Sequence, residues 1–536
     1  MVPPHQRTVA HLARSAPLGC YLAARKSWCS GVHSVRRAFP LARAATTGLM
    51  TGSLGSGAIV AVGLYLAAIL AVGYAARRHR ADESLAEFYL AGRRLSGPVL
   101  LLTLYATQYS GNTLIGYPGE AYRLGFSWVM SVGFMMAIIV AYLLFAPRLH
   151  YLARRHGFVT PGDWVTHRFG SPALTLFANL LLVAAVSNYL LAQLVAMGHI
   201  TAGLSGGTVP YWVGVVLLTL VVLVYETVGG MRAVAWTDAI QGLMLMVGLT
   251  GLMIAISPTP TKLAEITQLI AAEAPSKTAV PGWDISRNWF STLVLIGVSG
   301  AVYPHAIQRI FAARDNTALK HSLGTMVFLP LVTTGIVFLI GVFAIAEFSG
   351  AGPIEPDQVL PLLLTKWGET SPILYALSLL VIVAVVSAIM STADSVLLSL
   401  SSILAKDVLG TTVLRGADEA RLTRTGKTLS WVLVAGLVGL ALNPRLTLWG
   451  LTELKMEILA QVAPLFVLGV GWSRLTTRAA LSGMVTGTAA YITLLATGHP
   501  EPWNVHAGVV ALGINLAVCV AMTHLGPALL HQPSNA

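Results

Sequence analysis

Apolar residues in this chain form long runs separated by short polar connections, and they do not alternate with polar residues along amphipathic helices or strands. A helix needs about 20 apolar residues to cross the hydrocarbon core of a bilayer. The runs have roughly this length, and we therefore predict an all-helical integral membrane protein with about 13 spans. Their residue ranges are 56–76, 98–118, 125–147, 172–203, 211–229, 233–256, 289–309, 322–347, 372–402, 427–443, 446–471, 477–498 and 503–525.

The composition excludes several classes of protein. Only 10% of the 536 residues are charged and 55% are hydrophobic, whereas soluble domains carry about 25% charged residues. A water-soluble enzyme, a nucleic-acid-binding protein and a disordered chain are therefore excluded, and we expect a lipid bilayer around the chain. Cys20 and Cys29 lie near the start and Cys519 lies in an apolar run, so we expect neither a disulfide framework nor a metal cluster.

Residues 1–49 form a basic N-terminal extension. They contain seven Lys or Arg, no Asp or Glu, and no run long enough to span a membrane. We interpret them as a mis-assigned start with Met50 as the true first residue, and the alternatives are an Arg-rich targeting segment or a disordered basic tail. The folded domain is predicted to cover residues 50–536.

The connections between the runs carry an uneven share of the basic residues. Connections that follow odd-numbered runs hold 20 Lys and Arg when the residues at the run boundaries (Arg309, Lys427 and Arg478) are counted with the connections, and those that follow even-numbered runs hold 6. Cytoplasmic loops are rich in Lys and Arg. The bias therefore predicts that the N-terminus lies outside and the C-terminus inside, which requires an odd number of spans.

Two of the predicted spans are interrupted. The second span is polar from Thr107 to Thr113, and the seventh contains Gly297, Gly300 and Pro304 within eight residues. These spans begin two five-span halves at 98–256 and 289–471, which would insert in opposite orientations. Interrupted helices at matching positions of inverted repeats indicate a midplane binding site in secondary transporters. The alternative is a pair of kinked helices with small-residue packing faces.

The ninth span carries a polar stripe. Ala388, Ser391, Thr392 and Ser395 are spaced i, i+3, i+4, i+7 and share one helix face. Two adjacent hydroxyls can ligate a small hard cation such as Na⁺, and backbone carbonyls freed at a helix break could supply further oxygens. The alternative is hydrogen bonding between helices by small hydroxyl residues.

Ionisable residues inside predicted spans are a further signal, because each is costly in a membrane. Asp238 is either a cation way-station on the inner side or a cap at the start of the sixth span. Asp394 is either an ion-path group or a carboxylate paired with a neighbour. His305 borders the break in the seventh span, where it could contact a solute, carry a proton or be a structural residue.

Charged residues also occur in the eleventh span. Lys455 lies between Glu453 and Glu457, and we expect local neutralisation of the lysine by either glutamate. We expect no arginine in the core that could clamp a carboxylate, so helix amino ends at the breaks would have to do so.

Four segments together resemble the sodium/solute symporter family, which contains the proline, pantothenate, monocarboxylate and sodium/glucose symporters. The resemblance covers about residues 56–525. The segments are Tyr109-Ser-Gly-Asn-Thr-Leu-Ile-Gly-Tyr-Pro-Gly119, Gly229-Gly-Met-Arg-Ala-Val-Ala-Trp-Thr-Asp-Ala-Ile-Gln-Gly242, Tyr303-Pro-His-Ala-Ile-Gln-Arg309 and Ala388-Ile-Met-Ser-Thr-Ala-Asp-Ser395.

The resemblance implies a five-plus-five inverted-repeat core of the LeuT type at about 98–471, and Na⁺-driven alternating access. It places a sodium site at the carbonyls of Ala106, Tyr109 and Ala388 and the hydroxyls of Ser391 and Thr392, with Asp238 on the inner sodium path. It places the solute between the two breaks, with Trp449 as a further candidate. The implied solute-binding residues are Gln108, Ser110, Asn112, Thr113, Ser299 and Tyr303.

Departures from the family pattern narrow the range of solutes that we expect. Proline-transporting members carry Asp where this chain has Gln108, and sugar-transporting members carry Glu and Gln where it has Asn112 and Thr113. The resemblance thus implies Na⁺ symport of an amino acid, a monocarboxylate or a pantothenate-like acid. We expect no cofactor apart from Na⁺ as coupling ion, no obligate protein partner, and a place in a bacterial plasma (inner) membrane.

Other functions stay open at this point. Asp238, Asp394 and His305 could support H⁺ coupling in the same fold. A solute sensor would need a separate signalling partner, since only about ten residues follow the last run. A membrane-embedded enzyme or respiratory subunit would need His, Cys or paired carboxylate clusters in the spans, and the sequence contains none.

Overall fold

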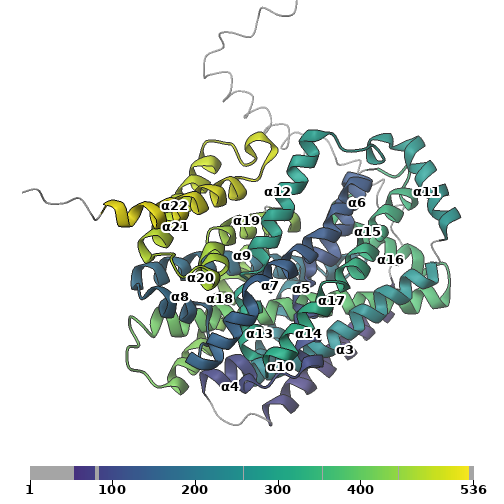
Figure 1. Cartoon of the computed structure of the whole chain (residues 1–536). Coiled ribbons are helices and arrows are strands. Elements are labelled where there is room, and N and C mark those ends of the chain that lie inside the picture. The colour runs from purple at the N-terminus through teal and green to yellow at the C-terminus, as the bar shows by residue number, and fades with distance from the viewer. Residues whose placement is uncertain (1–53, 79–83, 257–258, 353, 445, 530–536) are drawn as a thin grey trace, which may run out of the picture. The chain divides into compact units, whose positions relative to one another are not determined.

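The computed structural model describes residues 54–78, 84–256, 259–352, 354–444 and 446–529, and the regular elements in this part of the chain are helices (Figure 1). The interpretation of residues 1–49 therefore lies outside the described residues. The α-helices are α3 (Gly55–Arg77), α4 (Leu85–Leu90), α5 (Gly97–Gln108), α6 (Tyr117–Leu124), α7 (Ser131–His156), α8 (Pro161–Phe169), α9 (Pro172–Leu204), α10 (Tyr211–Ile256), α11 (Pro260–Glu273), α12 (Trp283–Gly300), α13 (Pro304–Ala312), α14 (Asn316–Met326), α15 (Leu329–Glu347), α16 (Val359–Gly368), α17 (Pro372–Ser402), α18 (Glu419–Ala441), α19 (Leu448–Ala460), α20 (Ala463–Gly471), α21 (Thr477–Ala496) and α22 (Ala507–Leu529).

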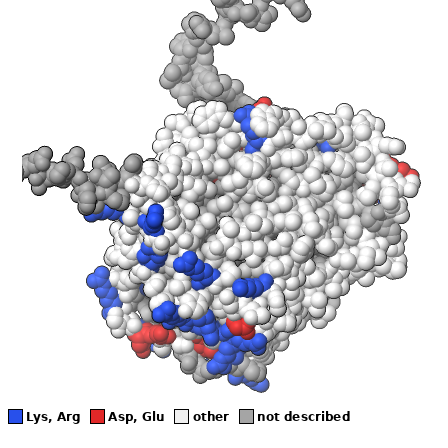
Figure 2. Space-filling view, in the orientation of Figure 1, with Lys and Arg blue, Asp and Glu red and all other residues white. Residues whose placement is uncertain are grey.

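Eight helical stretches among the described residues are long and apolar enough to cross a membrane, and ten if each of two bent pairs counts as one span. Some predicted spans are joined in one continuous helix, since α10 alone covers the predicted fifth and sixth spans. The chain is thus an integral membrane protein. On the face drawn in Figure 2, charged side chains gather mainly toward one end and the middle is almost free of them, as expected where lipid surrounds the helices.

The centre of the fold is α17. Ser371 caps its first turn by accepting a hydrogen bond from the Leu374 N–H, and Pro372 occupies the first helical position, where its missing N–H costs nothing. From Val381 to Ser402 every side chain is buried, against α10, α9, α3 and α5. The polar stripe predicted for this helix therefore lies in the protein interior and does not face lipid.

Both predicted interruptions are present. Helix α5 ends at Gln108, Tyr109 is extended (φ −96°, ψ 102°), and a π-helical turn at Asn112–Gly116 leads into α6. Helices α12 and α13 meet at an angle of 47°, because Pro304 begins α13 and cannot continue the α12 hydrogen-bond ladder. A third break, of 40° between α19 and α20, divides the predicted eleventh span near Pro464 in the first turn of α20, and we did not predict it.

Gly230 joins the predicted fifth and sixth spans within α10. Its backbone has φ 59° and ψ −156°, a conformation open essentially to glycine alone. A Cβ atom here would lie 2.6 Å from the Phe88 carbonyl oxygen and 2.8 Å from its ring. The close approach fixes α10 against α4.

Replacing Gly230 with alanine should therefore destabilise the protein by at least about 1–3 kcal/mol, the usual cost of such a strained backbone. The measurement is the apparent melting temperature of the detergent-solubilised protein. Gly324→Ala in α14 is the matched control, since no heavy atom lies within 4 Å of the added Cβ. An equal melting temperature for both variants would contradict the assignment of the kink to Gly230.

Candidate functional site

The α17 stripe brings three of the proposed sodium ligands together. The hydroxyls of Ser391 and Thr392 are fully buried. Thr392 Oγ1 donates a hydrogen bond of 3.0 Å to the Ala388 carbonyl, and Ser391 Oγ donates one of 2.5 Å to Asp238 Oδ1. Each hydroxyl uses its proton in these bonds, and each keeps lone pairs with which it can ligate a cation.

The break after α5 leaves two carbonyls free. No backbone N–H in the described part of the chain donates to the carbonyl of Ala106 or Tyr109, and the Gly111 N–H bonds instead to Gln193 Oε1 at 3.0 Å. Gly111 sits between α9 and α17: an added Cβ would lie 2.7 Å from Ala196 and 2.9 Å from Ile389. Free carbonyls are thus held against the helix that carries the hydroxyl pair.

A tyrosine of α9 links the break to the stripe. The Tyr189 hydroxyl interacts with both Ser110, at the break, and Thr392, on α17. The broken helix and the hydroxyl pair therefore lie close to each other.

A fully buried ion pair links four helices near Ser395, the last residue of the polar stripe. Arg309 Nη2 donates to Asp238 Oδ2 at 2.7 Å and to Ser395 Oγ at 2.5 Å. Arg309 Nε donates to Thr103 Oγ1 at 2.8 Å, and Thr103 in turn bonds Asp238. The pair joins α5, α10, α13 and α17.

One prediction about this region is wrong, and one of the two alternatives for Asp238 is ruled out. Arg309 is fully buried, although we expected it in a polar connection and expected no arginine in the core. The apolar residues Ile310–Ala313 that follow it extend the interior beyond the predicted end at 309, and this was the available signal. Asp238 does not cap a helix, because α10 is helical on both sides of it.

Asp394 is paired with neighbours. Its carboxylate accepts a hydrogen bond of 2.5 Å from the Tyr225 hydroxyl and one of 3.0 Å from Ser395 Oγ. Of the two interpretations left open for Asp394, the geometry favours the paired one. Ser395 links it to the Arg309 network.

A small polar pocket lies between the breaks. Five of the predicted solute-binding residues line it: Gln108, Ser110, Asn112, Thr113 and Tyr303. Sequence reasoning missed four further residues with polar groups that line the pocket: Tyr117, Tyr189, Thr452 and Lys455. Ser299 does not line the pocket but donates a hydrogen bond of 2.7 Å to the carbonyl of Met456, which does.

The pocket is narrow in this conformation. Its volume is about 10 Å³, which is roughly the space for one water molecule. Any organic solute would need a conformation in which the helices around the pocket have separated.

Trp449 lies outside the pocket lining. Its indole packs in an aromatic cluster, at ring distances of 4.9 Å from Trp128, 5.8 Å from Tyr117 and 6.2 Å from Phe134. Tyr117 itself lines the pocket, so Trp449 stands one ring behind it.

Lys455 is not neutralised by its two glutamates. The Lys455 Nζ atom lies 3.1 Å from the ring centroid of Tyr189 and 5.2 Å from that of Tyr303. The carboxylates of Glu453 and Glu457 instead lie near His506. Residues two positions apart on a helix point to different sides, which is why the expected pairing fails.

His305 is buried beside the break in α12–α13. Neither ring nitrogen has a hydrogen-bond partner among the described residues, and the ring stacks on Tyr303 at 4.9 Å. The expected alternatives for His305 were a contact with solute, a proton carrier or a structural role, and its place beside Tyr303 leaves all three as hypotheses.

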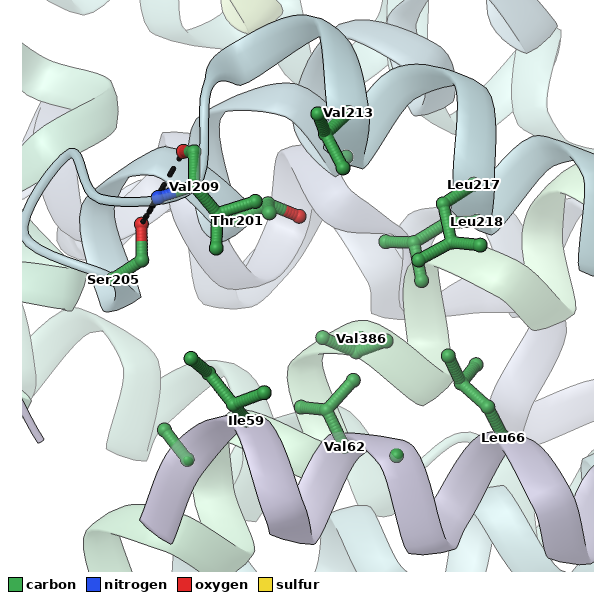
Figure 3. A pocket seen from close by; sticks show the side chains of 13 residues that line it. Ile59, Val62, Leu66, Thr201, Ser205, Val209, Val213, Leu217, Leu218 and Val386 are labelled. Carbon is green, nitrogen blue, oxygen red and sulfur yellow. Dashed lines mark hydrogen bonds between the residues drawn. The ribbon is translucent and has the colours of Figure 1, made fainter. Parts of the chain in front are cut away.

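A roomier crevice of about 210 Å³ lies between α3, α9, α10 and α17 (Figure 3). Its lining is aliphatic apart from Thr201 and Ser205, whose hydroxyls donate to backbone carbonyls of their own chain segment. It offers no group that could select a polar solute. The polar pocket between the breaks is therefore the better candidate for a solute site.

His506 forms a charged cluster just before α22. Three side chains meet here: one carboxylate oxygen from Glu453, one from Glu501 and one ring nitrogen of His506 lie within 4.8 Å of one another. The His506 Nδ1 atom is also 3.7 Å from Glu457 Oε1. Burial alone would lower the pKa of His506, but these carboxylates outweigh it and raise the pKa above its usual value.

This cluster predicts a pH-dependent stability. A raised pKa in the folded state means that the stabilisation is present below the ordinary pKa of histidine and is lost as pH rises through the raised value. We expect the apparent melting temperature of solubilised protein to fall as the pH rises from below the ordinary pKa of histidine through the raised pKa of His506, and His506→Gln to flatten that part of the curve. His321→Gln, at an exposed position, is the control. An unchanged pH profile in His506→Gln would refute the prediction.

Buried hydroxyls, a buried ion pair and a polar pocket beside broken helices, all inside an apolar bundle, are features of a membrane transporter. The sequence model of the Sodium:solute symporter family matches residues 88–487, and the chain belongs to this family. The resemblance seen in the sequence is thereby confirmed.

Curated relatives match along most of their length. The chain is 28% identical over 477 residues to the sodium/pantothenate symporter of Escherichia coli (strain K12), covering 87% of this chain and 96% of that protein. It is 27% identical over 459 residues to the osmoregulated proline transporter OpuE of Bacillus subtilis (strain 168), covering 84% and 90%.

Solved structures share the fold. A Na⁺-coupled sialic acid symporter in a substrate-bound outward-open state matches with a TM-score of 0.72 at 20% identity, covering 88% of this chain and 97% of that one. The nucleobase-cation-symport-1 family transporter Mhp1, in a closed conformation, matches with a TM-score of 0.52 at 16% identity, covering 84% and 96%. These neighbours are LeuT-fold-like transporters.

Proposed function

We propose that the protein is a Na⁺-coupled symporter that moves a small organic solute by alternating access. The solute is an amino acid, a monocarboxylate or a pantothenate-like acid. The observation that carries the proposal is the buried hydroxyl pair Ser391 and Thr392 held beside the unpaired carbonyls of a broken helix. The named functions of the curated relatives support it.

The sodium site in this proposal has five oxygens. They are the carbonyls of Ala106, Tyr109 and Ala388 and the hydroxyls of Ser391 and Thr392. Asp238 lies next to the site. Its Oδ1 atom accepts a hydrogen bond of 2.5 Å from Ser391 Oγ, and this bond orients a lone pair of the hydroxyl away from the carboxylate. Its own charge is balanced by Arg309 at 2.7 Å. Sodium leaving inward would pass Asp238.

The solute site lies between the breaks. Gln108, Ser110, Asn112, Thr113 and Tyr303 contact the solute, and Ser299 holds the α19 backbone beside it. Because the pocket is narrow, we assign this conformation to a state between outward-open and inward-open. A bound solute would need a wider pocket than this state provides.

The membrane arrangement follows from the charge bias. We propose about 13 spans with inverted repeats at 98–256 and 289–471, the N-terminus outside and the C-terminus inside, in a bacterial plasma membrane. The fold of the transporter neighbours supports the repeats, and the organisms of the curated relatives support the location.

The sodium gradient is large enough for this task. One charge crossing 100 mV is worth about 2.3 kcal/mol, and a tenfold concentration gradient adds about 1.4 kcal/mol. The sum of roughly 3.7 kcal/mol per ion supports several-hundred-fold accumulation at one ion per neutral solute. One Na⁺ moving with one monoanion carries no net charge, so for an acid the concentration gradient alone acts and supports about tenfold accumulation.

The test is uptake into proteoliposomes under an inward Na⁺ gradient, with a K⁺ gradient as control. The panel contains proline, other amino acids, short monocarboxylates, pantothenate and glucose. The proposal predicts Na⁺-dependent accumulation of one acid or amino acid. Uptake driven only by a pH gradient would replace Na⁺ by H⁺, and solute binding without transport would favour a sensor.

A further inference from the structure

We infer that Lys455 binds the carboxylate of the transported solute, and that this solute is a carboxylate anion without an ammonium group. This inference rests on the proposed function, because it assigns the solute of the same pocket. It selects among the amino acid, monocarboxylate and pantothenate-like classes.

The first observation is the environment of the lysine. Lys455 is 2% exposed and its side chain lines the polar pocket. Among the described residues, its Nζ atom has neither a hydrogen bond nor an ion pair and contacts the rings of Tyr189 and Tyr303. A buried ammonium is costly without an anionic partner, and a cation–π contact with tyrosine rings returns only part of that cost. A bound carboxylate would complete the site.

The second observation is the absence of other charge in the described lining. None of the lining residues is Asp or Glu. The nearest glutamates on α19, Glu453 and Glu457, are engaged on the other side with His506. An ammonium group on the solute would therefore stand beside a lysine and meet no carboxylate, so a zwitterionic amino acid is disfavoured.

The third observation concerns the neutral polar groups. Gln108 Oε1, Asn112 Oδ1 and Thr452 Oγ1 are buried and have no hydrogen-bond partner among the described residues. Carbonyl oxygens accept hydrogen bonds. A solute with hydroxyl or amide N–H donors would satisfy them, and leaving such groups unpaired is expensive. The pocket thus fits a hydroxy- or amido-carboxylate.

The test compares each acid with a neutral analogue that keeps its shape. Purified protein is titrated with pantothenate and pantothenol, with lactate and lactamide, and with proline, and binding is followed as thermal stabilisation in Na⁺ buffer. We expect at least one acid to bind ten times or more tightly than its neutral partner, and proline to bind weakly.

Variants separate binding from structure. Lys455→Gln should weaken acid binding tenfold or more, and Lys455→Arg should retain most of it. Without solute, Lys455→Gln should melt at the same or a higher temperature than the parent, since it removes an uncompensated charge; a lysine with a purely structural role would show the opposite. Lys366→Gln, at a solvent-exposed ion pair with Glu347, is the control.

Three results would overturn the inference: equal binding of acid and neutral analogue, unchanged acid binding in Lys455→Gln, or binding by no acid of the panel. These binding assays need no ion gradient. Lys455-dependent acid binding without Na⁺-driven uptake would overturn the proposed symport alone, and any of the three results above together with Na⁺-driven uptake of an amino acid or acid of the panel would overturn the inference alone.

Discussion

Thr392→Ala is expected to raise the Na⁺ concentration for half-maximal uptake at least tenfold, a loss of about 1.4 kcal/mol or more in sodium binding. The substitution removes one of two side-chain oxygens from the proposed site, and the alanine methyl cannot replace it. The measurement is uptake as a function of Na⁺ concentration in proteoliposomes.

Ser378→Ala is the matched control for this prediction. Ser378 lies on the same helix, is fully buried, and its hydroxyl has no hydrogen-bond partner among the described residues. Its removal should leave the sodium dependence unchanged. If Thr392→Ala shows the sodium dependence of this control, Thr392 is not a ligand.

Arg309→Met is expected to destabilise the protein by about 3–5 kcal/mol, because it leaves the Asp238 carboxylate buried without its partner. The measurement is the apparent melting temperature of the solubilised protein, together with the yield of monodisperse protein. Arg314→Met should have little effect, since Arg314 pairs with Asp315 where both side chains are exposed.

A second substitution tests whether the loss comes from the uncompensated charge. In Asp238→Asn combined with Arg309→Met, no charge is left unpaired, so the double variant should recover a large part of the stability lost in Arg309→Met. If the double variant is as unstable as the sum of the two single variants, the two side chains act independently and the network described here is wrong.

The parts of the site that depend on local pattern could be predicted from the sequence. The spacing of Ser391 and Thr392 placed them on one helix face, and glycine and proline within apolar runs marked the breaks in the second and seventh spans. Such signals survive folding because helix geometry and the cost of free backbone groups in lipid act within a few residues.

The parts of the site that depend on which helices pack against each other could not be predicted from the sequence. The partner of Asp238 is Arg309, 71 positions away, and hydropathy assigned that arginine to a connection. Lys455 and its glutamates are neighbours in sequence but point to different partners, Tyr189 and His506, which only tertiary packing decides. The break between α19 and α20 likewise lies at a proline, and no local pattern distinguished this proline from one that a continuous span tolerates.

The most direct test of the central claim, a sodium site between α17 and the break after α5, is equilibrium binding of ²²Na⁺ to the purified protein. The account predicts saturable binding that unlabelled Na⁺ displaces and K⁺ does not, and loss of that binding in a Ser391→Ala, Thr392→Ala double variant that melts within a few degrees of the parent. Equal ²²Na⁺ binding by the parent and this variant would contradict the account.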